Sequence, residues 1–356
     1  MGKLAVYKYV AMMFLVLQLI VSAYTFLGLF GGDVNPVGNM ARAMVVYILP
    51  ILIILNFILL IYWLVRKRWI ISILPLVTIL CCIPYIGTII QFRSVDEKIG
   101  DAQKGIKIAT YNVAKFNRET SGFLAQDILA EMKRQKVDIF CIQEYMETGG
   151  DVNNTTSYKE YFPYVSLAGR DVAVFSRYPI KKMKPFLFED SNQAGMYVDI
   201  DVNGQVFRIF NVHLETTGIN RTMYKAGKLE AQGYDVSKNR VLNAVYGNYS
   251  LGMMFRAAQA NIIANEIRSS EKPCIVCGDF NDVPYSYVYN TMKGDLVDGF
   301  KECGSGFMYT FRGGKKMVRI DYIFHDEMFK GLTFYKKELT YSDHYPVFLK
   351  LEMNKE

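Results

Sequence analysis

Polar residues suited to phosphate ester chemistry gather in six short segments of the C-terminal two thirds of the chain. The segments are 110–113 (Thr-Tyr-Asn-Val), 142–144 (Ile-Gln-Glu), 211–214 (Asn-Val-His-Leu), 278–281 (Gly-Asp-Phe-Asn), 319–322 (Arg-Ile-Asp-Tyr) and 342–346 (Ser-Asp-His-Tyr-Pro). Hydrolysis of a phosphate ester needs a metal ion that neutralises the phosphoryl oxygens, a positioned water and a stabilised leaving group. The six segments supply residue types for all three tasks.

The carboxylates and amides of these segments suit a hard divalent cation. Mg²⁺ typically binds one or two carboxylates and keeps several of its waters. Glu144 is a natural carboxylate ligand, Asn112 adds a neutral amide beside it, and Asp343 offers a second carboxylate to the metal or its water. We therefore expect a Mg²⁺ site, with Mn²⁺ as the alternative ion, at these three residues.

Other residues suit the attacking water and the phosphoryl group. Asp279 and Asn281 are two residues apart, so they would share one face of an extended segment, where one polarises the water and the other donates to phosphate. His213 and His344 are two of only three histidines, and a neighbouring carboxylate favours the charged form of such a donor. Asp321 is the expected partner of His344.

Apolar, strand-like runs precede most of the six segments. They cover 106–109, 139–142, 206–210 and 274–277. Converging strand ends are where α/β enzymes place their chemistry. We expect further strands over 172–175, 196–202, 332–339 and 347–351, a hairpin turn at Asn203-Gly204, and helices over 124–136 and 255–267. The third histidine, His325, follows a strand, and we assign it to a surface turn without a role.

The order of these motifs resembles the endonuclease/exonuclease/phosphatase superfamily. The resemblance covers about residues 106–351 and is most specific at 278–281 and 342–344. It implies a four-layer α/β sandwich, in which two packed mixed β-sheets are flanked by helices. It also implies a Mg²⁺-dependent phosphoesterase site between the sheet ends.

Carried over motif by motif, the resemblance gives each site residue a role. The implied metal-site residues are Asn112, Glu144 and Asp343. Among the implied catalytic residues, His213 and Asn281 contact the phosphate and Asp279 orients the water. Asp321 pairs with the catalytic His344. Asp171 replaces a glycine usual in the family and would support His213. A histidine at position 213 is similar to the pattern of the phosphatase, sphingomyelinase and deoxyribonuclease branches of the family. It differs from the pattern of the abasic-site endonucleases.

Three apolar spans occupy the N-terminal quarter of the chain. Residues 9–30 and 44–65 carry no charge, and 69–92 is similar; about 20 such residues cross a bilayer core of ~30 Å. We expect a three-helix transmembrane anchor over 1–92, a juxtamembrane linker over 93–105 and a catalytic domain over 106–352. A cleaved signal peptide is the alternative for the first span, but its apolar run is too long for one.

The positions of lysine and arginine predict the orientation of these spans. Lys3 and Lys8 precede the first span, and Arg66, Lys67 and Arg68 lie between the second and third. Because cytoplasmic loops carry the basic residues, we expect an inner (cytoplasmic) membrane protein, multi-pass, with an extracytoplasmic catalytic domain.

Charge and cysteine content exclude some classes of protein. Residues 1–92 hold six basic residues and one acid, which leaves 35 basic and 33 acidic residues for 93–356. That near-neutral balance does not favour a nucleic-acid binder. Six cysteines are too few for a disulfide scaffold. Cys274 and Cys277 should face opposite sides of one strand, so buried free thiols are expected.

Residues 215–254 do not follow the alternation of strand-like and helix-like patterns seen in the rest of this domain. A connection of that length is usually a functional or disordered loop, and an exposed insertion without a role is the alternative. The segment follows His213, so we expect it to border the cleft, with Arg221 and Tyr224 binding substrate.

The leading hypothesis is a membrane-tethered phosphohydrolase that uses an activated water to cleave a phosphodiester or phosphomonoester. We expect a lipid-linked or other envelope substrate in preference to a small molecule or nucleic acid. The alternatives are an extracytoplasmic, deoxyribonuclease-like nuclease and a catalytically silent, membrane-anchored binding module. The sequence indicates no particular protein partner.

Overall fold

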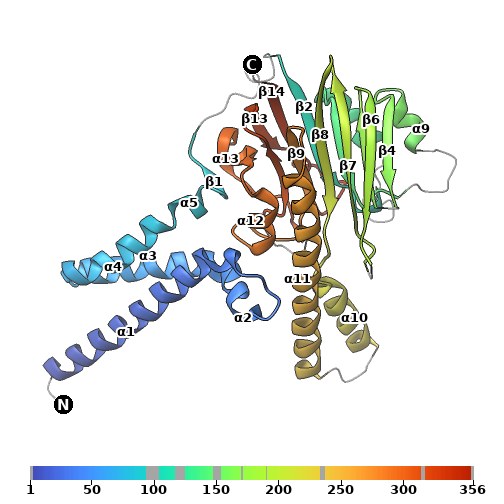
Figure 1. The fold of residues 1–356 in the computed structure, drawn as a ribbon. Coiled ribbons are helices and arrows are strands. Elements are labelled where there is room, and N and C mark those ends of the chain that lie inside the picture. Colours follow the sequence, from blue (N-terminus) through green and yellow to red (C-terminus); the bar gives the residue numbers. More distant parts are fainter. Residues whose placement is uncertain are drawn as a thin grey trace. The chain divides into compact units, whose positions relative to one another are not determined.

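A computed structural model describes residues 3–93, 104–116, 125–146, 154–169, 171–189, 191–232, 237–313 and 317–353 (Figure 1). The chain forms two compact units. The first, which holds the three apolar spans and is called the membrane-helix unit, comprises Met1–Thr88 and Val283–Asn290. The second, called the catalytic unit because it holds the residues expected to be catalytic, comprises Ile89–Asp282 and Thr291–Glu356. The expected linker 93–105 falls largely on residues 94–103, outside the described residues.

Two six-stranded mixed sheets form the catalytic unit. Sheet one runs β13 (Phe329–Lys336), β14 (Val347–Met353), β2 (Ile106–Asn112), β3 (Ile139–Gln143), β5 (Val172–Ser176) and β4 (Tyr164–Ala168). Sheet two runs β10 (Val297–Asp298), β12 (Asp321–His325), β9 (Cys274–Asp279), β8 (Gln205–His213), β7 (Ala194–Val202) and β6 (Ile180–Leu187). The central pairs β2–β3 and β8–β9 are parallel. A short third pair joins β1 (Ile90–Gln91) to β11 (Gly306–Phe307).

Helices flank the two sheets. The outer face of sheet one is covered by α8 (Ala125–Arg134) and α9 (Asn154–Lys159), and that of sheet two by the C-terminal half of α11 (Lys238–Arg268). The remaining elements are α10 (Ile219–Ala231), which contacts α11, α12 (Tyr287–Lys293), α13 (Gly299–Cys303), which contacts strands of both sheets, and the 3₁₀ turn η3 (Ala114–Phe116). Every residue of β2, β3, β5 and β9 is buried, because these strands are covered on both faces. The expected four-layer α/β sandwich is confirmed.

Two large apolar clusters form the core among the described residues of the catalytic unit. The larger part lies between the sheets, where Ile108 and Ile139 of sheet one meet Ile209 and Ile275 of sheet two. The second lies between sheet one and its helices and contains an aromatic group of Phe140, Tyr158, Phe162 and Phe175. On the other side, Ile263 of α11 lies against the backbone of Gly195 in β7.

The predicted strands and the hairpin turn are found, but the expectations for residues 215–254 and for His325 are wrong. The β7–β8 turn has positive φ at Asn203 (54°) and Gly204 (90°), as a two-residue Asn-Gly hairpin requires. The long connection 215–254 is instead a helical hairpin of α10 and the first half of α11. His325 is not at the surface: it is fully buried at the end of β12, with Nε2 2.8 Å from Oε2 of Glu302, which compensates its burial.

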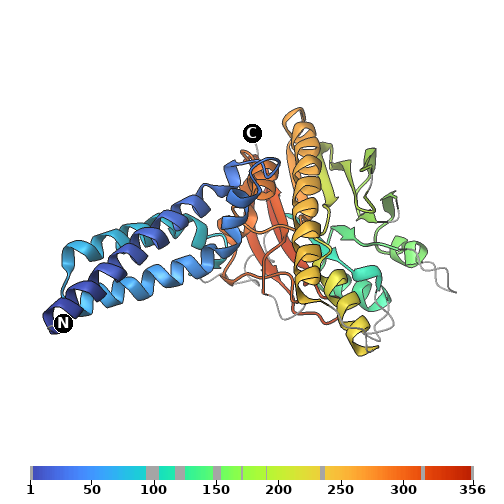
Figure 2. The ribbon, with the colours of Figure 1, turned by 90° about the horizontal axis from the view of Figure 1, so that it is seen from below.

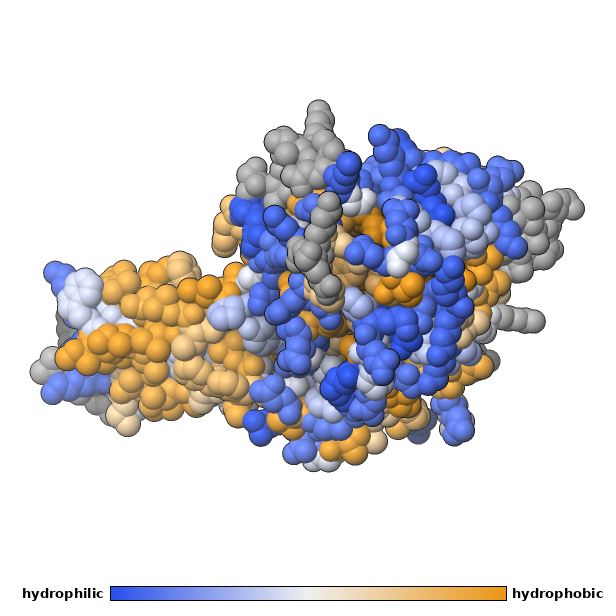
Figure 3. Space-filling model, turned by 45° about the horizontal axis from the view of Figure 1, so that its top comes forward, coloured by the Kyte–Doolittle hydropathy of each residue, from blue (hydrophilic) through white to orange (hydrophobic). Residues whose placement is uncertain are grey.

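The membrane-helix unit contains α1 (Lys3–Leu29), η1 (Gly31–Asp33), α2 (Met40–Ala43), η2 (Met44–Ile48), α3 (Leu49–Val65), α4 (Trp69–Cys81) and α5 (Ile83–Ile86). Three stretches, Val6–Leu29, Met40–Val65 and Trp69–Ile86, are long and apolar enough to cross a membrane. Figure 2 shows α1, α3 and α4 side by side, and Figure 3 shows the hydrophobic surface of this unit. The third span ends at Ile86, earlier than expected, because Ile90 already belongs to β1.

A buried polar network links the three long helices of this unit. The Asn56 side chain accepts hydrogen bonds from Gln18 (3.0 Å) and Ser22 (3.1 Å) and donates to Thr25 (2.8 Å). Thr78 of α4 donates to Ser22 at 3.2 Å. Since unpaired polar groups are costly in lipid, mutual hydrogen bonding lets these side chains be buried between the helices.

Candidate active site

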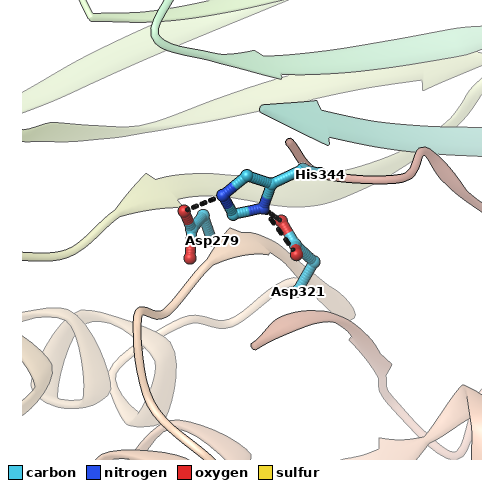
Figure 4. Close-up of side chains that lie close together, drawn as sticks. All are labelled: Asp279, Asp321 and His344. Carbon is cyan, nitrogen blue, oxygen red and sulfur yellow. Dashed lines mark hydrogen bonds and ion pairs between the residues drawn. The ribbon is translucent and has the colours of Figure 1, made fainter. Parts of the chain in front are cut away.

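Two strand ends and one loop bring Asp279, Asp321 and His344 together (Figure 4). Asp279 ends β9 and lies directly opposite Asp321, the first residue of antiparallel β12. His344 comes from the loop before β14. Its Nδ1 lies 2.9 Å from Oδ2 of Asp321, and its Nε2 lies 3.6 Å from Oδ2 of Asp279. All three side chains are buried.

A second histidine reaches the same carboxylate from the other side. His213 ends β8, and its Nε2 lies 3.9 Å from Oδ2 of Asp279. Its Nδ1 lies 2.8 Å from Oδ1 of Asp171, which precedes β5 in sheet one. Oδ2 of Asp171 also accepts the backbone N–H of Ala194 at 2.8 Å, which fixes the carboxylate. Asp279 therefore faces two histidines, each held by its own aspartate.

Burial and neighbouring charges act on these groups in opposite directions. Burial alone lowers the pKa of His213, but Asp171 raises it to about 9. Burial also lowers the pKa of His344, and Asp321 and Asp279 raise it to about 10. Burial raises the pKa of Asp279, and the neighbouring imidazoles of His344 and His213 lower it; the resulting pKa is about 6. At neutral pH both histidines are therefore cationic, and Asp279 is mainly ionised.

Asn112 and Glu144 lie beside this group. The Asn112 amide donates to Oδ2 of Asp279 at 3.0 Å and to Oε1 of Glu144 at 3.3 Å. Glu144 follows β3 with a φ of 51°, a left-handed turn that ends the strand. A half-buried carboxylate next to a buried carboxylate offers hard oxygens, which suit Mg²⁺. The side-chain oxygen of Asn112 instead accepts the backbone N–H of Ala114 at 3.0 Å.

The loop that carries Asp343 is fixed to the same strand end. The Ser342 hydroxyl donates to the backbone oxygen of Asn112 at 2.8 Å, which places Asp343 next to β2. Asp343 itself is exposed. Asp279, Asp321 and His344 also offer ligand atoms within 4.8 Å of one another. We favour Glu144 over that trio for Mg²⁺, because the trio includes an imidazole nitrogen of His344, whereas Mg²⁺ prefers oxygen ligands.

Asn281 is placed differently from the extended geometry expected from the sequence. Its φ is 51°, so it does not share a strand face with Asp279; asparagine tolerates this left-handed conformation. Its backbone N–H donates to Oδ1 of Asp279 at 2.8 Å, and its side-chain amide donates to the oxygen of Leu214 at 2.9 Å. Gly278 is required here, because a Cβ would lie 1.9 Å from the oxygen of Val212.

The described part of the chain includes only the backbone of two candidate substrate-binding residues. The backbone of Arg221 and Tyr224 belongs to α10, but both side chains lie outside the described residues.

Sequence reasoning missed a polar connection between the two sheets behind the site. Gln143 of β3 donates to the Asn211 side chain of β8 at 2.6 Å and to the Thr110 hydroxyl at 3.0 Å. The Asn211 amide donates to the backbone oxygens of Ile142 (3.0 Å) and Ala173 (2.9 Å). The available signal was an amide residue directly after an apolar run in each strand, Gln143 at the end of β3 and Asn211 in β8.

A second missed pair lies on α11. Gln259 accepts the backbone N–H of Glu215 at 2.8 Å, and Arg256 donates to the backbone oxygen of the same residue at 2.9 Å. Nε of Arg256 also lies 3.3 Å from Oδ2 of Asp282. Both α11 side chains are buried, so they hold the loop after His213 in place.

Comparison with known proteins agrees with this geometry. A model of the endonuclease/exonuclease/phosphatase family matches residues 109–344, and a model of a domain of unknown function matches residues 11–89. No curated protein matches the chain in sequence.

Solved structures with the same fold include an endonuclease/exonuclease/phosphatase from Bacteroides vulgatus. It is 16% identical, with a TM-score of 0.51, over 71% of this chain and 100% of that one. A family protein from Bacteroides thetaiotaomicron is 19% identical, with a TM-score of 0.50, over 71% and 99%. One from Beutenbergia cavernae is 17% identical, with a TM-score of 0.51, over 70% and 72%.

Proposed function

The chain belongs to the endonuclease/exonuclease/phosphatase family, and we propose that it is a membrane-tethered, divalent-metal-dependent phosphohydrolase. One observation carries the proposal: Oδ2 of Asp279 lies between Nε2 of His213 (3.9 Å) and Nε2 of His344 (3.6 Å). An anionic group between two cationic donors is an arrangement that can hold a water against a phosphoryl group. Electrostatic preorganisation of this kind is a large part of enzymatic rate enhancement.

Asp279 is the residue that we assign to the attacking water. Its Oδ1 accepts the N–H of Asn281 (2.8 Å) and its Oδ2 accepts the amide of Asn112 (3.0 Å), so its orientation is fixed before substrate binds. With a pKa of about 6 it is a carboxylate at neutral pH and strong enough as a base to orient and polarise the water.

His213 and His344 are the proposed donors to the phosphoryl oxygens. Asp171 and Asp321 each hold the Nδ1 of one ring, so both Nε2–H groups point toward the Asp279 side of the site. Because the pKa values of the rings are about 9 and 10, both stay cationic at neutral pH and can stabilise the charge of the transition state.

Glu144 is the proposed main ligand of the divalent cation, with Asn112 beside it and Asp343 on the adjoining loop. A bound Mg²⁺ would neutralise the phosphoryl oxygens and stabilise the leaving group. Mn²⁺ prefers the same oxygen ligands and is the alternative ion.

For the substrate, we propose a phosphodiester or phosphomonoester of the membrane or cell envelope, cleaved outside the cytoplasmic membrane. The three membrane-length helices favour this choice, since a tethered enzyme meets surface-bound substrates at high effective concentration. An extracytoplasmic nuclease is the second candidate. A silent binding module is disfavoured, because each carboxylate and histidine that the reaction needs is present.

The test is a substrate panel on the purified full-length chain in lipid nanodiscs. Phospholipid, inositol phosphate, bis-p-nitrophenyl phosphate and plasmid DNA would each be supplied with Mg²⁺ or with EDTA. We expect metal-dependent phosphate ester cleavage, with phospholipid turned over faster than DNA. Robust DNA cleavage would select the nuclease, and turnover that EDTA leaves unchanged would contradict the metal-dependent mechanism.

A further inference from the structure

Helix α11 is longer than the sheet that it covers. In its C-terminal half, Met253, Ala257, Ala260 and Ala264 are buried, and their spacing of three and four residues places them on one face. The same spacing continues toward the N-terminus through Tyr249, Tyr246 and Leu242. Tyr249 is half-buried, and beyond it the face is exposed, with exposed fractions of 56% for Tyr246 and 66% for Leu242. The apolar face of α11 thus extends beyond the core of the catalytic unit.

Helix α10 packs against the N-terminal half of α11, and the two form a helical hairpin that follows shortly after His213 in the chain. Asn248 of α11 donates to the Thr222 hydroxyl of α10 at 2.8 Å. At the base, a Cβ on Gly252 would lie 2.7 Å from the oxygen of Thr216, so the two segments approach closely. In Figure 1, α10 and the N-terminal half of α11 project past the strands of the catalytic unit. Met223 of α10 adds a further apolar side chain, 54% exposed.

The hairpin also concentrates positive charge. Residues 219–254 contain five basic and two acidic residues, whereas the remainder of 93–356 contains 30 basic and 31 acidic residues. Among the described side chains, Lys228, Lys238 and Arg240 are exposed near the tip. Exposed apolar and aromatic side chains beside lysine and arginine are typical of helices that lie in the interface of an anionic bilayer.

The connection to the membrane helices favours a lipid surface as the partner. Only residues 87–89 separate α5 from β1, the first strand of the catalytic unit. Three residues span at most about 11 Å, so the catalytic unit is covalently held at the membrane that the apolar helices would cross. Docking on lipid therefore costs little additional loss of freedom.

We propose that the α10–α11 hairpin is a membrane-docking element whose partner is the anionic lipid surface. Leu242 and Tyr246 enter the interfacial layer, and Lys228, Lys238 and Arg240 contact lipid phosphates. Through Arg256 and Gln259, which bind both backbone groups of Glu215, the docked helix holds the loop after His213 at the bilayer. This consequence for catalysis rests on the proposed function, whereas docking itself does not.

Spin labels on the full-length chain in nanodiscs test the docking directly. Cys81, the one exposed thiol among the six cysteines, is first replaced by serine. Labels at Leu242→Cys and Tyr246→Cys are compared with a label at Leu187→Cys, a matched control on β6 with an exposed fraction of 67%. Accessibility to oxygen and to a water-soluble nickel chelate is then measured in anionic and in zwitterionic nanodiscs.

In anionic nanodiscs we expect high oxygen and low nickel accessibility at 242 and 246, and the reverse at 187. Replacing Lys228, Lys238 and Arg240 by glutamate should weaken docking by at least on the order of a hundredfold, because each lost basic residue contributes about 1 kcal/mol near the surface and the glutamates add repulsion. Equal nickel accessibility at all three sites would overturn the proposal. A fall in nickel accessibility at 242 and 246 on addition of DNA, with no such fall on lipid, would also overturn the proposal.

Hydrolysis of a soluble phosphodiester separates docking from catalysis. The glutamate variant should keep its turnover of bis-p-nitrophenyl phosphate, because none of its three substituted residues lies in the catalytic machinery. A docked hairpin in a chain without hydrolase activity would contradict the proposed function alone. An active enzyme with an undocked hairpin would contradict this inference alone.

Discussion

Asp171 and His213 lie 2.8 Å apart (Oδ1 to Nδ1), although they come from different sheets and are 42 residues apart in sequence. The pair sets the charge of His213, since Asp171 raises the pKa of its imidazole to about 9 despite burial. We predict that Asp171→Asn lowers this pKa, so that the alkaline limb of the activity profile moves to lower pH. The pH dependence of kcat/KM for both proteins measures the shift; superimposable profiles would contradict the role of Asp171.

The same pair makes stability depend on pH. The pKa of His213 is raised from 6.5 to about 9 in the folded protein, so the folded state favours the protonated ring. The contribution of this ring to the free energy of unfolding is fully present below pH 6.5 and is lost as pH rises to about 9. A pKa shift of this size corresponds to about 3 kcal/mol of that free energy. Asp171→Asn should therefore lower the melting temperature more at pH 6 than at pH 9.5. An equal loss at both pH values would contradict the linkage.

Glu144 should control metal affinity. Glu144→Gln keeps the volume of the side chain and removes its charge, so the apparent Mg²⁺ affinity should fall and turnover should drop by about 10²-fold or more. A Mg²⁺ titration of activity measures both effects. Glu160→Gln, at an exposed position outside the site, is the matched control and should behave as the native protein. An unchanged Mg²⁺ dependence in Glu144→Gln would remove this residue from the metal site.

The connection between the sheets should be important for stability. Asn211→Ala removes three buried hydrogen bonds, one from the Gln143 amide and one to each of two backbone oxygens, and each contributes about 0.5–1.5 kcal/mol. We expect a total loss of several kcal/mol, measured by thermal unfolding of the detergent-solubilised full-length chain. Asn243→Ala, at an exposed position on α11, should change the melting temperature little. Similar melting temperatures for the two variants would count against a structural role for Asn211.

The orientation of the chain is testable without any assay of activity. In a Cys81→Ser background, a membrane-impermeant maleimide applied to right-side-out vesicles should label Glu160→Cys and spare Lys67→Cys; both positions are exposed. The positive-inside distribution of basic residues is the reason for this expectation. Labelling of Lys67→Cys alone would place the catalytic unit in the cytoplasm and change the class of substrate.

Strand ends were the most predictable part of the structure. Apolar runs locate β2, β3, β8 and β9, and the polar residues that follow them are therefore brought to one edge. The conformation of Asn281 was not predictable, because a left-handed φ leaves no mark on residue spacing. His325 was misplaced for a different reason: its partner Glu302 lies on α13, and only the fold shows that the two side chains meet.

The α10–α11 hairpin was missed although its pattern is present in the sequence. Leu242, Tyr246, Tyr249 and Met253 recur at helical spacing, but the surrounding glycines, asparagines and polar residues are typical of a loop. The burial of Met253 against the catalytic unit, which the sequence does not reveal, supports the helix from its C-terminal half.

The central claim is that Asp279 activates water between two cationic histidines, and Asp279→Asn tests it most directly. The substitution keeps the shape of the side chain but removes its charge and basicity. With saturating Mg²⁺ and bis-p-nitrophenyl phosphate, we predict that kcat falls by about 10²-fold or more, while the fold persists and Asp295→Asn, at an exposed position, stays fully active. Turnover of Asp279→Asn within twofold of the native enzyme would contradict the account.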